Sequence, residues 1–354
     1  MNLASLLETW GDSTVLAMAG ALVGFIFGLA AQRTRFCARA AVIECCEGQM
    51  GERFSVWWLA FGACLLGVQT LAFTGGLLPG TSRYIAPTGS VSGAILGGLC
   101  FGAGMILTRG CASRLLILSA NGNLRALLAG LVFAVTVQAS IAGWLAPARQ
   151  ALGTWWQIDG GPARDLLQLS GIGAVGGLLL ALLAFGTGVF LFFKTHHGRW
   201  GLALGACSTG LAIALGWGLT QAIAAQSFEA VQIQSLSYSS ASAEMLMRML
   251  STGTAPSWGF DASMLPATFL GSLLGAAVGG DFQFQGFKTE NKMGHYLTGA
   301  VLMGFGAVLA GGCTVGAGMT GGSVFALTAW LTLIAIWLGA GLTCRLHRRM
   351  NWAM

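Results

Sequence analysis

The sequence predicts an all-α polytopic membrane protein, and three observations lead to this fold class. Only 8% of the 354 residues are Asp, Glu, Lys or Arg, against roughly 25% in an ordinary soluble domain. Hydrophobic residues make up 55% of the chain, and the mean hydropathy is +0.74. The 55 glycines let helices approach closely within lipid. These values exclude a soluble enzyme, and residues 1–354 are predicted to form one integral membrane domain.

Nine apolar stretches are long enough to cross the hydrocarbon core of a bilayer, which takes about 17 to 25 residues. No charged segment with a small-residue cleavage site precedes the first of them, so no removable signal peptide is expected. In chain order the predicted spans are 14–31, 54–73, 91–107, 124–146, 169–193, 200–225, 262–280, 295–310 and 323–345.

The basic residues predict the orientation of these spans. The net charge of +6, from 18 basic and 12 acidic residues, indicates basic cytoplasmic loops rather than a nucleic-acid partner. The tail holding Arg345, Arg348 and Arg349 places the C-terminus in the cytoplasm, and an odd number of spans then places the N-terminus outside. The basic residues that fall outside in this arrangement are Arg83, Arg149, Arg164 and Arg248.

Two long connections, 147–168 and 226–261, are predicted to be extracytoplasmic, the second with a surface helix near 241–250. Neither resembles a folded soluble domain. Glycines with small-xxx-small spacing, such as Gly20, Gly24 and Gly28, are predicted to pack helices and to carry no chemistry.

A weak internal repeat relates residues 96–111 to residues 298–313, at an offset of 202 that sets Cys111 over Cys313. Several identities arise by chance in a glycine-rich chain. The two copies are nevertheless preceded by spans of opposite direction, which indicates an inverted-topology repeat, as in many transporters. The predicted half-repeats are 14–146 and 169–345.

A short segment follows each of these cysteines, at 112–121 and 314–322. Both are too short to cross the membrane and are predicted to be re-entrant helices. Gly110 with Cys111, and Gly312 with Cys313, would then precede a helix N-terminus, where free N–H groups favour an anion. The alternative, a small buried hydrophobic thiol, stays equally open on these residues alone.

A third cysteine, Cys37, lies among the arginines of the segment QRTRFCARAA. Such charge suits the exit of an anion path, although on these residues alone a positive-inside loop is the favoured interpretation. We take Arg35, Arg109 and Arg114 as further candidate anion contacts. The repeat offset pairs Cys37 with Ser239, so this thiol is not duplicated.

The remaining cysteines and histidines predict no metal site and no cofactor. The nine cysteines contain no CxxC pair and no Cys/His cluster with zinc spacing, so free thiols are expected. Cys45 and Cys46 are adjacent, which is poor geometry for a disulfide, and are predicted to be a surface pair that could be redox-reactive. His196 and His197 are predicted to lie in a wetted cytoplasmic turn. No nucleotide-binding motif is present.

The segments RTRFC (33–37), GAGMILTRGC (102–111) and GAVLAGGC (306–313) resemble the three cysteine motifs of the YeeE/YedE family of bacterial inner-membrane sulfur-compound transporters. The resemblance covers most of the chain. It implies an hourglass-shaped, multi-pass protein of the inner membrane that takes up thiosulfate. It also implies that Cys37, Cys111 and Cys313 pass the anion along by transient S–H···S hydrogen bonds, and that a small TusA-like (YeeD-like) sulfurtransferase is the cytoplasmic partner.

The leading hypothesis is therefore a thiosulfate importer and not an enzyme. One alternative is a membrane-embedded thiol redox or sulfur-transfer enzyme that uses the cysteines as nucleophiles. The others are an importer of a selenium or other small sulfur compound, and a channel for another small anion in which the cysteines only pack.

Overall fold

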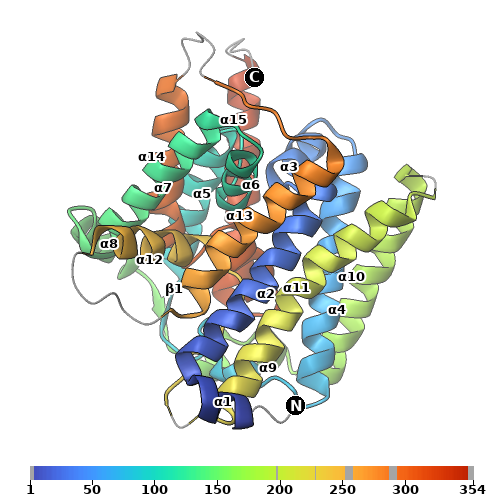
Figure 1. Ribbon diagram of the computed structural model, residues 1–354, viewed down its shortest axis with the longest axis vertical. Coiled ribbons are helices and arrows are strands. Elements are labelled where there is room, and N and C mark those ends of the chain that lie inside the picture. Colours follow the sequence, from blue (N-terminus) through green and yellow to red (C-terminus); the bar gives the residue numbers. More distant parts are fainter. Residues whose placement is uncertain (1–3, 197, 228, 252–257, 287–292, 350–354) are drawn as a thin grey trace.

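The structure is a computed structural model and describes residues 4–196, 198–227, 229–251, 258–286 and 293–349. Within these ranges nine helices are long and apolar enough to cross a membrane. They run side by side along the long axis of the molecule, with α1 at one end and the end of α15 at the other (Figure 1). The predicted fold class, an all-α polytopic membrane protein, is confirmed.

The long helices follow the predicted spans closely. They are α2 (Asp12–Arg33), α4 (Glu52–Phe73), α5 (Val91–Leu107), α7 (Leu124–Ala142), α10 (Gly173–His196), α11 (Trp200–Ala224), α13 (Phe260–Gly279), α14 (Met293–Leu309) and α15 (Leu327–Arg349). The shorter elements are α1 (Ala4–Trp10), α3 (Ala38–Cys46), η1 (Pro79–Thr81), β1 (Gly89–Ser90), α6 (Ala112–Ala120), α8 (Ala146–Gly153), β2 (Gln157–Ile158), η2 (Gly161–Arg164), α9 (Leu166–Leu169), α12 (Tyr238–Leu250) and η3 (Thr314–Gly321). The strands β1 and β2 pair antiparallel.

Three predicted boundaries differ from the structure where the backbone leaves the helical conformation. The helix α7 ends at Ala142 because Gly143 is extended. The stretch before α10 is broken at Gly171 and Gly173, which both have positive φ. The last helix, α15, begins at Leu327, after a turn in which Phe325 has a φ of 54°.

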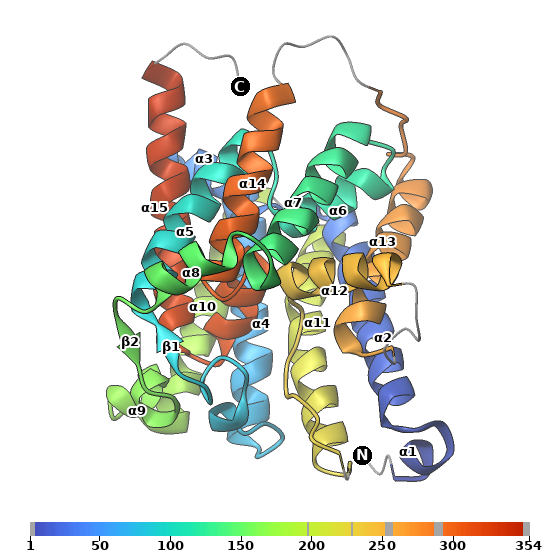
Figure 2. The same ribbon diagram turned by 90° about the vertical axis from the view of Figure 1, so that its left-hand side faces the viewer.

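The helix α12 corrects the prediction of a surface helix near residues 241–250. Its first turns are buried: Tyr238 is 1% exposed and Ala241 is fully buried. It packs against α7 and α13 and lies across the bundle near its middle (Figure 2). Apart from Tyr238, its buried residues are serine and alanine, so hydropathy alone did not reveal this burial.

Small residues bring the long helices close together, as predicted. A Cβ atom on Gly20, Gly24 or Gly28 of α2 would collide with backbone carbonyl oxygens of α13. On α5, a Cβ atom on Gly97 would lie 2.5 Å from the backbone nitrogen of Ala310. These glycines therefore serve helix packing.

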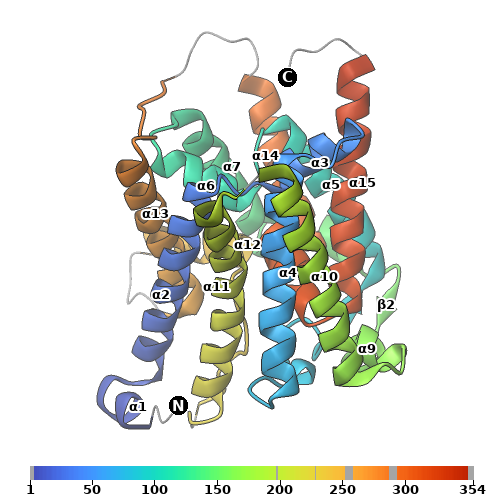
Figure 3. The same ribbon diagram turned by 90° about the vertical axis from the view of Figure 1, so that its right-hand side faces the viewer.

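The helix contacts come in matching pairs. The helix α2 packs on α13 and α11 packs on α4, while α5 packs on α15 and α14 packs on α7. The short α3 contacts α4 as α12 contacts α13, and α6 contacts α7 as η3 contacts α15. We propose that residues 12–142 and 200–349 are the two inverted halves. The helix α10 lies beside α4 (Figure 3) and would then belong to neither half. The predicted half-repeat 169–345 had included it.

His196 corrects a further expectation, that of a wetted turn. It is 6% exposed, its ring stacks on Phe192 with the ring centroids 4.4 Å apart, and its Nδ1 lies 2.9 Å from the hydroxyl of Thr195. His197 lies outside the described residues. In the described ranges no group of three or more His, Cys, Asp or Glu side chains comes together in a geometry suited to a metal ion.

Candidate functional site

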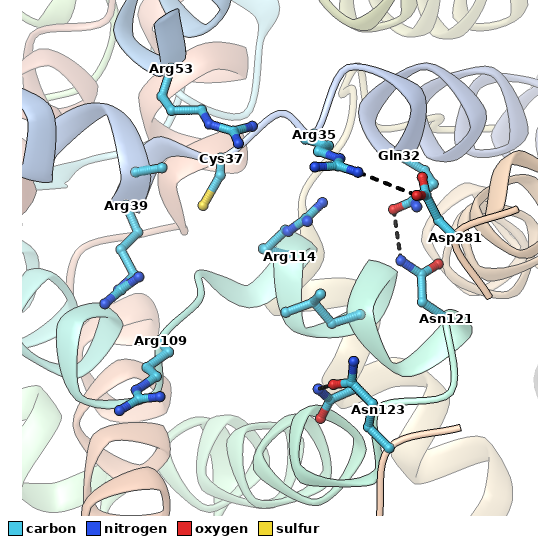
Figure 4. Close-up of a pocket in the computed structure, with 13 residues that line it drawn as sticks. Gln32, Arg35, Cys37, Arg39, Arg53, Arg109, Arg114, Asn121, Asn123 and Asp281 are labelled. Carbon is cyan, nitrogen blue, oxygen red and sulfur yellow. Dashed lines mark hydrogen bonds and ion pairs between the residues drawn. The ribbon is translucent and has the colours of Figure 1, made fainter. Parts of the chain in front are cut away.

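A cavity of about 450 Å³ opens at the α15 end of the bundle. Figure 4 shows five arginine side chains around it. We call this cavity the arginine vestibule. Its lining residues are Gln32, Arg35, Cys37, Arg39, Ala40, Arg53, Arg109, Arg114, Leu118, Asn121, Asn123, Asp281 and Gln285.

Cys37 is the thiol of the arginine vestibule. It is half-buried and is the N-cap residue of α3, with an extended backbone. Its sulfur points into the space between the side chains of Arg39, Arg53 and Arg114 (Figure 4). A soft thiol thus stands among cations that attract an anion.

The charge of the vestibule is strongly positive. Asp281 is the one acidic residue among those lining it, and a carboxylate oxygen of Asp281 lies 3.3 Å from Nη2 of Arg35. Nη1 of Arg114 and Nε of Arg39 are buried and have no hydrogen-bond partner in the part of the chain that the structure describes. Unpaired buried donors of a cation are costly, and a bound anion would satisfy them.

Two of these arginines occupy strained backbone positions. Arg35 has a φ of 52° and Arg109 a φ of 59°, in the left-handed region that costs a non-glycine residue roughly 1–2 kcal/mol. Each stands two residues before a cysteine. Gly311, with a φ of 78°, stands two residues before Cys313. Arginine at a position that glycine fills without strain indicates a functional role for the side chain.

Cys111 lies deeper than Cys37 and is 1% exposed. It is the N-cap residue of α6, and its Sγ lies 3.4 Å from the hydroxyl oxygen of Ser113. Cys37 and Thr314, the first residue of η3, lie near this thiol. The first turn of α6 directs free N–H groups toward the same point.

Cys313, like Cys111, is placed at the start of a short helix. It is fully buried and is the N-cap residue of η3. The N–H of Gly316 donates to its Sγ over 3.4 Å, so the thiol lies directly at the start of this short helix. A Cβ atom on Gly312 would come within 2.6 Å of the backbone nitrogen of Ala317, which explains the glycine before this cysteine.

A second group of polar side chains lies close to Cys313 and includes residues of the loop that precedes β1. Its centre is Tyr84, which is 6% exposed and lies close to Cys313, Ser237 and Asp261. Burial raises the pKa of Tyr84 to about 12, so its hydroxyl stays protonated. We call this group the tyrosine chamber.

Four buried polar atoms in and around the tyrosine chamber have no hydrogen-bond partner within the described ranges. They belong to Ser82, Tyr84, Asp261 and Thr314. Such a concentration is unusual, because buried polar groups are nearly always paired. It indicates a hydrated or ligand-binding space.

Arg83 brings a positive charge to the tyrosine chamber. Its guanidinium lies 5.4 Å from the centre of the Tyr84 ring, donates to Gln234 over 2.7 Å and lies 3.9 Å from Asp261. An anion reaching this point would meet both a cation and a neutral hydroxyl donor.

The structure brings together four of the predicted site residues, Cys37, Arg35, Arg109 and Arg114, in the arginine vestibule. Cys111 and Cys313 cap the short helices α6 and η3, and Cys111 lies close to Thr314 at the start of η3. Gly110 accepts a hydrogen bond from Thr108 over 2.9 Å through its carbonyl oxygen, and its predicted role as a ligand contact stays a prediction.

Sequence reasoning missed the tyrosine chamber and the central Tyr238. Tyr238 is buried near both Cys111 and Cys313, and its hydroxyl lies 3.1 Å from that of Thr268. Neither Tyr84 nor Tyr238 stands in a motif. The sequence signal that came nearest was the pairing of Cys37 with Ser239, two residues from the N-cap Ser237 of α12.

Comparison with known proteins gives a consistent result. The family model described as "Sulphur transport" matches residues 33–342. A protein of Spirochaeta thermophila named "Thiosulfate transporter TsuA" is 27% identical over 354 residues, which covers 95% of this chain and 97% of that protein. A protein of the same name from Escherichia coli is 24% identical over 347 residues, 92% of each chain.

Proposed function

Because the chain belongs to the sulphur transport family, we propose that it takes up thiosulfate, or a closely related sulfur-containing anion, across the bacterial inner membrane. The family and both relatives support transport of sulfur compounds rather than an enzymatic reaction. One observation of the structure carries the choice of a sulfur anion. Two buried thiols each cap a short helix, Cys111 lies close to Thr314 at the start of the second of these helices, and a third thiol lies in a cavity lined by five arginines.

The proposed route begins at the tyrosine chamber. There Arg83 attracts the anion and the Tyr84 hydroxyl donates to it. The anion then passes Cys313 and Cys111, whose weak S–H donors hold a soft sulfur atom loosely enough to release it. The arginines of the vestibule draw it past Cys37, and water at the open mouth screens their charge and allows exit.

The proposed orientation places the arginine vestibule and the end of α15 in the cytoplasm, and the N-terminus outside, as the basic loops predict. A TusA-like sulfurtransferase at the vestibule mouth would receive the sulfur. A fluorescent protein fused after residue 354 should therefore fluoresce, whereas alkaline phosphatase fused there should be inactive. Active phosphatase at the C-terminus would reverse the proposed direction.

The transport proposal is tested by uptake of labelled thiosulfate into cells that lack their own thiosulfate importers. We expect uptake in cells that express the chain, with inhibition by unlabelled thiosulfate and weaker inhibition by an equal concentration of sulfate, which has no soft terminal sulfur. No uptake by a protein shown to be inserted in the membrane would overturn the substrate assignment.

Tyr84→Phe tests the tyrosine chamber. The hydroxyl of Tyr84 has no hydrogen-bond partner in the described part of the chain, so its removal should not lower the thermal stability of the purified protein. If the hydroxyl donates to the anion, the KM for uptake should rise at least about tenfold, since a hydrogen bond to a charged group contributes about 1.5–3 kcal/mol. Unchanged KM would remove Tyr84 from the route.

A further inference from the structure

Two grooves open in the outer wall of the bundle, one beside the short helix α3 and the other beside the short helix α12. The first lies between α3, α4 and α15 and has a volume of about 430 Å³. We call it the α3 groove. The second lies between α6, α7, α12 and α13 and has a volume of about 410 Å³. We call it the α12 groove. A helix as short as α3, of 9 residues, leaves part of its long neighbours uncovered.

Six of the 13 residues that line the α3 groove are aromatic, among them Phe54, Trp57, Phe61, Trp330 and Trp337. Several of them contact one another, with the Trp57 and Trp337 ring centroids 5.0 Å apart. In a membrane protein such a surface faces hydrocarbon, so an acyl chain is its natural occupant. From Trp330 to Arg345 the groove follows α15 for about 22 Å at 1.5 Å per residue, a length comparable with an extended fatty acyl chain.

The α3 groove also has a charged end. Arg345 lines it and is exposed. In the described ranges Arg345 has neither an ion pair nor a side-chain hydrogen bond. One turn further on, Arg348 is paired with Glu47 instead. A cation without a partner, at the end of an apolar groove and near the end of a spanning helix, fits a lipid phosphate.

Two indole N–H groups in the α3 groove are also without partners. Nε1 of Trp57 and Nε1 of Trp337 are buried and have no hydrogen-bond acceptor in the part of the chain described. Trp57 is only 2% exposed. Buried indole N–H groups usually find an acceptor, and Trp57 and Trp337 both line the groove.

The α12 groove provides a contrast within the same molecule. Its lining contains leucine, methionine, phenylalanine and two serines but no charged residue. Hydrocarbon of any lipid would fill it equally well. The difference between the two grooves therefore lies in the headgroup end, at Arg345.

We propose that the α3 groove is a specific binding site for one anionic phospholipid. The acyl chain lies along the aromatic rings of α4 and α15, and the headgroup phosphate binds Arg345. This site is independent of the transport route. It places a lipid against α3, the helix that Cys37 caps.

The test is native mass spectrometry of the full chain, purified with equal amounts of phosphatidylglycerol and phosphatidylcholine that carry the same acyl chains. We expect the protein to retain one phosphatidylglycerol with at least fivefold preference. Arg345→Gln should abolish this preference, and Trp337→Phe should weaken retention. Arg348→Gln is the matched control, since this residue lies one turn away, carries the same charge and does not line the groove.

Two results would overturn the proposal. One is equal retention of both lipids by the parent protein. The other is an equal loss of preference in Arg345→Gln and Arg348→Gln, which would show general attraction to the basic tail instead of a site. Thermal melting of each variant in detergent without added lipid separates these outcomes from misfolding.

Discussion

Replacing Cys111 by alanine is expected to reduce thiosulfate uptake by at least about tenfold at matched expression, since the loss of one buried hydrogen-bonding partner costs roughly 1–3 kcal/mol. Cys111 is 1% exposed and caps α6, so its thiol is a buried donor at the start of this helix. Cys313→Ala should have a similar effect, because the second thiol has the same relation to η3. Initial rates of labelled thiosulfate uptake measure both.

Cys100→Ala is the matched control for this prediction. Cys100 lies on α5, ahead of Cys111 in the chain, is half-buried and lines neither the arginine vestibule nor the tyrosine chamber. It should transport at the parent rate. If Cys111→Ala transported as fast as Cys100→Ala, the thiol would be a packing residue only.

Two further measurements separate the alternatives for the thiols. Cys111→Ser keeps a hydroxyl donor but removes the soft sulfur, so full uptake by this variant would favour a general anion channel. A persulfide on Cys111 in mass spectra after incubation with thiosulfate would favour covalent sulfur transfer. The transport proposal expects reduced uptake in the first case and an unmodified thiol in the second.

Gly306→Ala is expected to lower the stability of the protein by about 2–3 kcal/mol, as overpacking of a tight core does. A Cβ atom at this position would lie 2.6 Å from the carbonyl oxygen of Gly97 and 2.6 Å from the backbone nitrogen of Phe101. Backbone atoms on the neighbouring helix cannot move aside as a side chain can. The midpoint of thermal unfolding in detergent should fall by roughly 5 °C.

Gly186→Ala provides the opposite result. Gly186 also lies inside a long helix, α10, but a Cβ atom there would meet nothing within 4 Å. Alanine stabilises an exposed helix by roughly 0.5–1 kcal/mol relative to glycine, so this variant should melt at the same temperature or slightly above the parent. Equal behaviour of the two variants would show that α5 and α14 do not cross at Gly306.

The spans were predictable because hydropathy reports directly on burial in lipid. Residues 91–107 were placed without error. The errors occurred where a glycine or a turn ends the helix inside an apolar stretch, as at Gly143 and Gly173. The helix α12 was predicted near residues 241–250, but its buried first turns were not, because serine and alanine give little hydropathy signal.

The candidate site was predictable where it is local in sequence. The thiols of Cys111 and Cys313 stand out by their Gly-Cys context, and the arginines cluster around Cys37. The tyrosine chamber is assembled from Tyr84, Ser237 and Asp261, which come from three distant segments. No single-sequence pattern links such residues.

The repeat offset explains why the sequence comparison did not single out Ser237. The helix α5 begins at residue 91 and α14 at 293, whereas α3 begins at 38 and α12 at 238. The offset is thus 202 for one pair and 200 for the other. A single offset set Cys37 over Ser239, although the N-cap residue of α12 is Ser237. Because the offset changes by two residues, the sequence comparison missed Ser237 and with it the tyrosine chamber, where the proposed route begins.

The arginine vestibule has an electrical consequence. Because the cavity opens to water and reaches inward to Cys37, the membrane voltage falls mainly across the thinner layer that holds Cys111 and Cys313. Moving one elementary charge against 100 mV requires about 2.3 kcal/mol, and a dianion about twice that. At equilibrium, thiosulfate inside the cell would then be roughly three powers of ten more dilute than outside. Net uptake through this proposed route therefore requires that the cell remove thiosulfate at the inner mouth as fast as it arrives, or that protons accompany it.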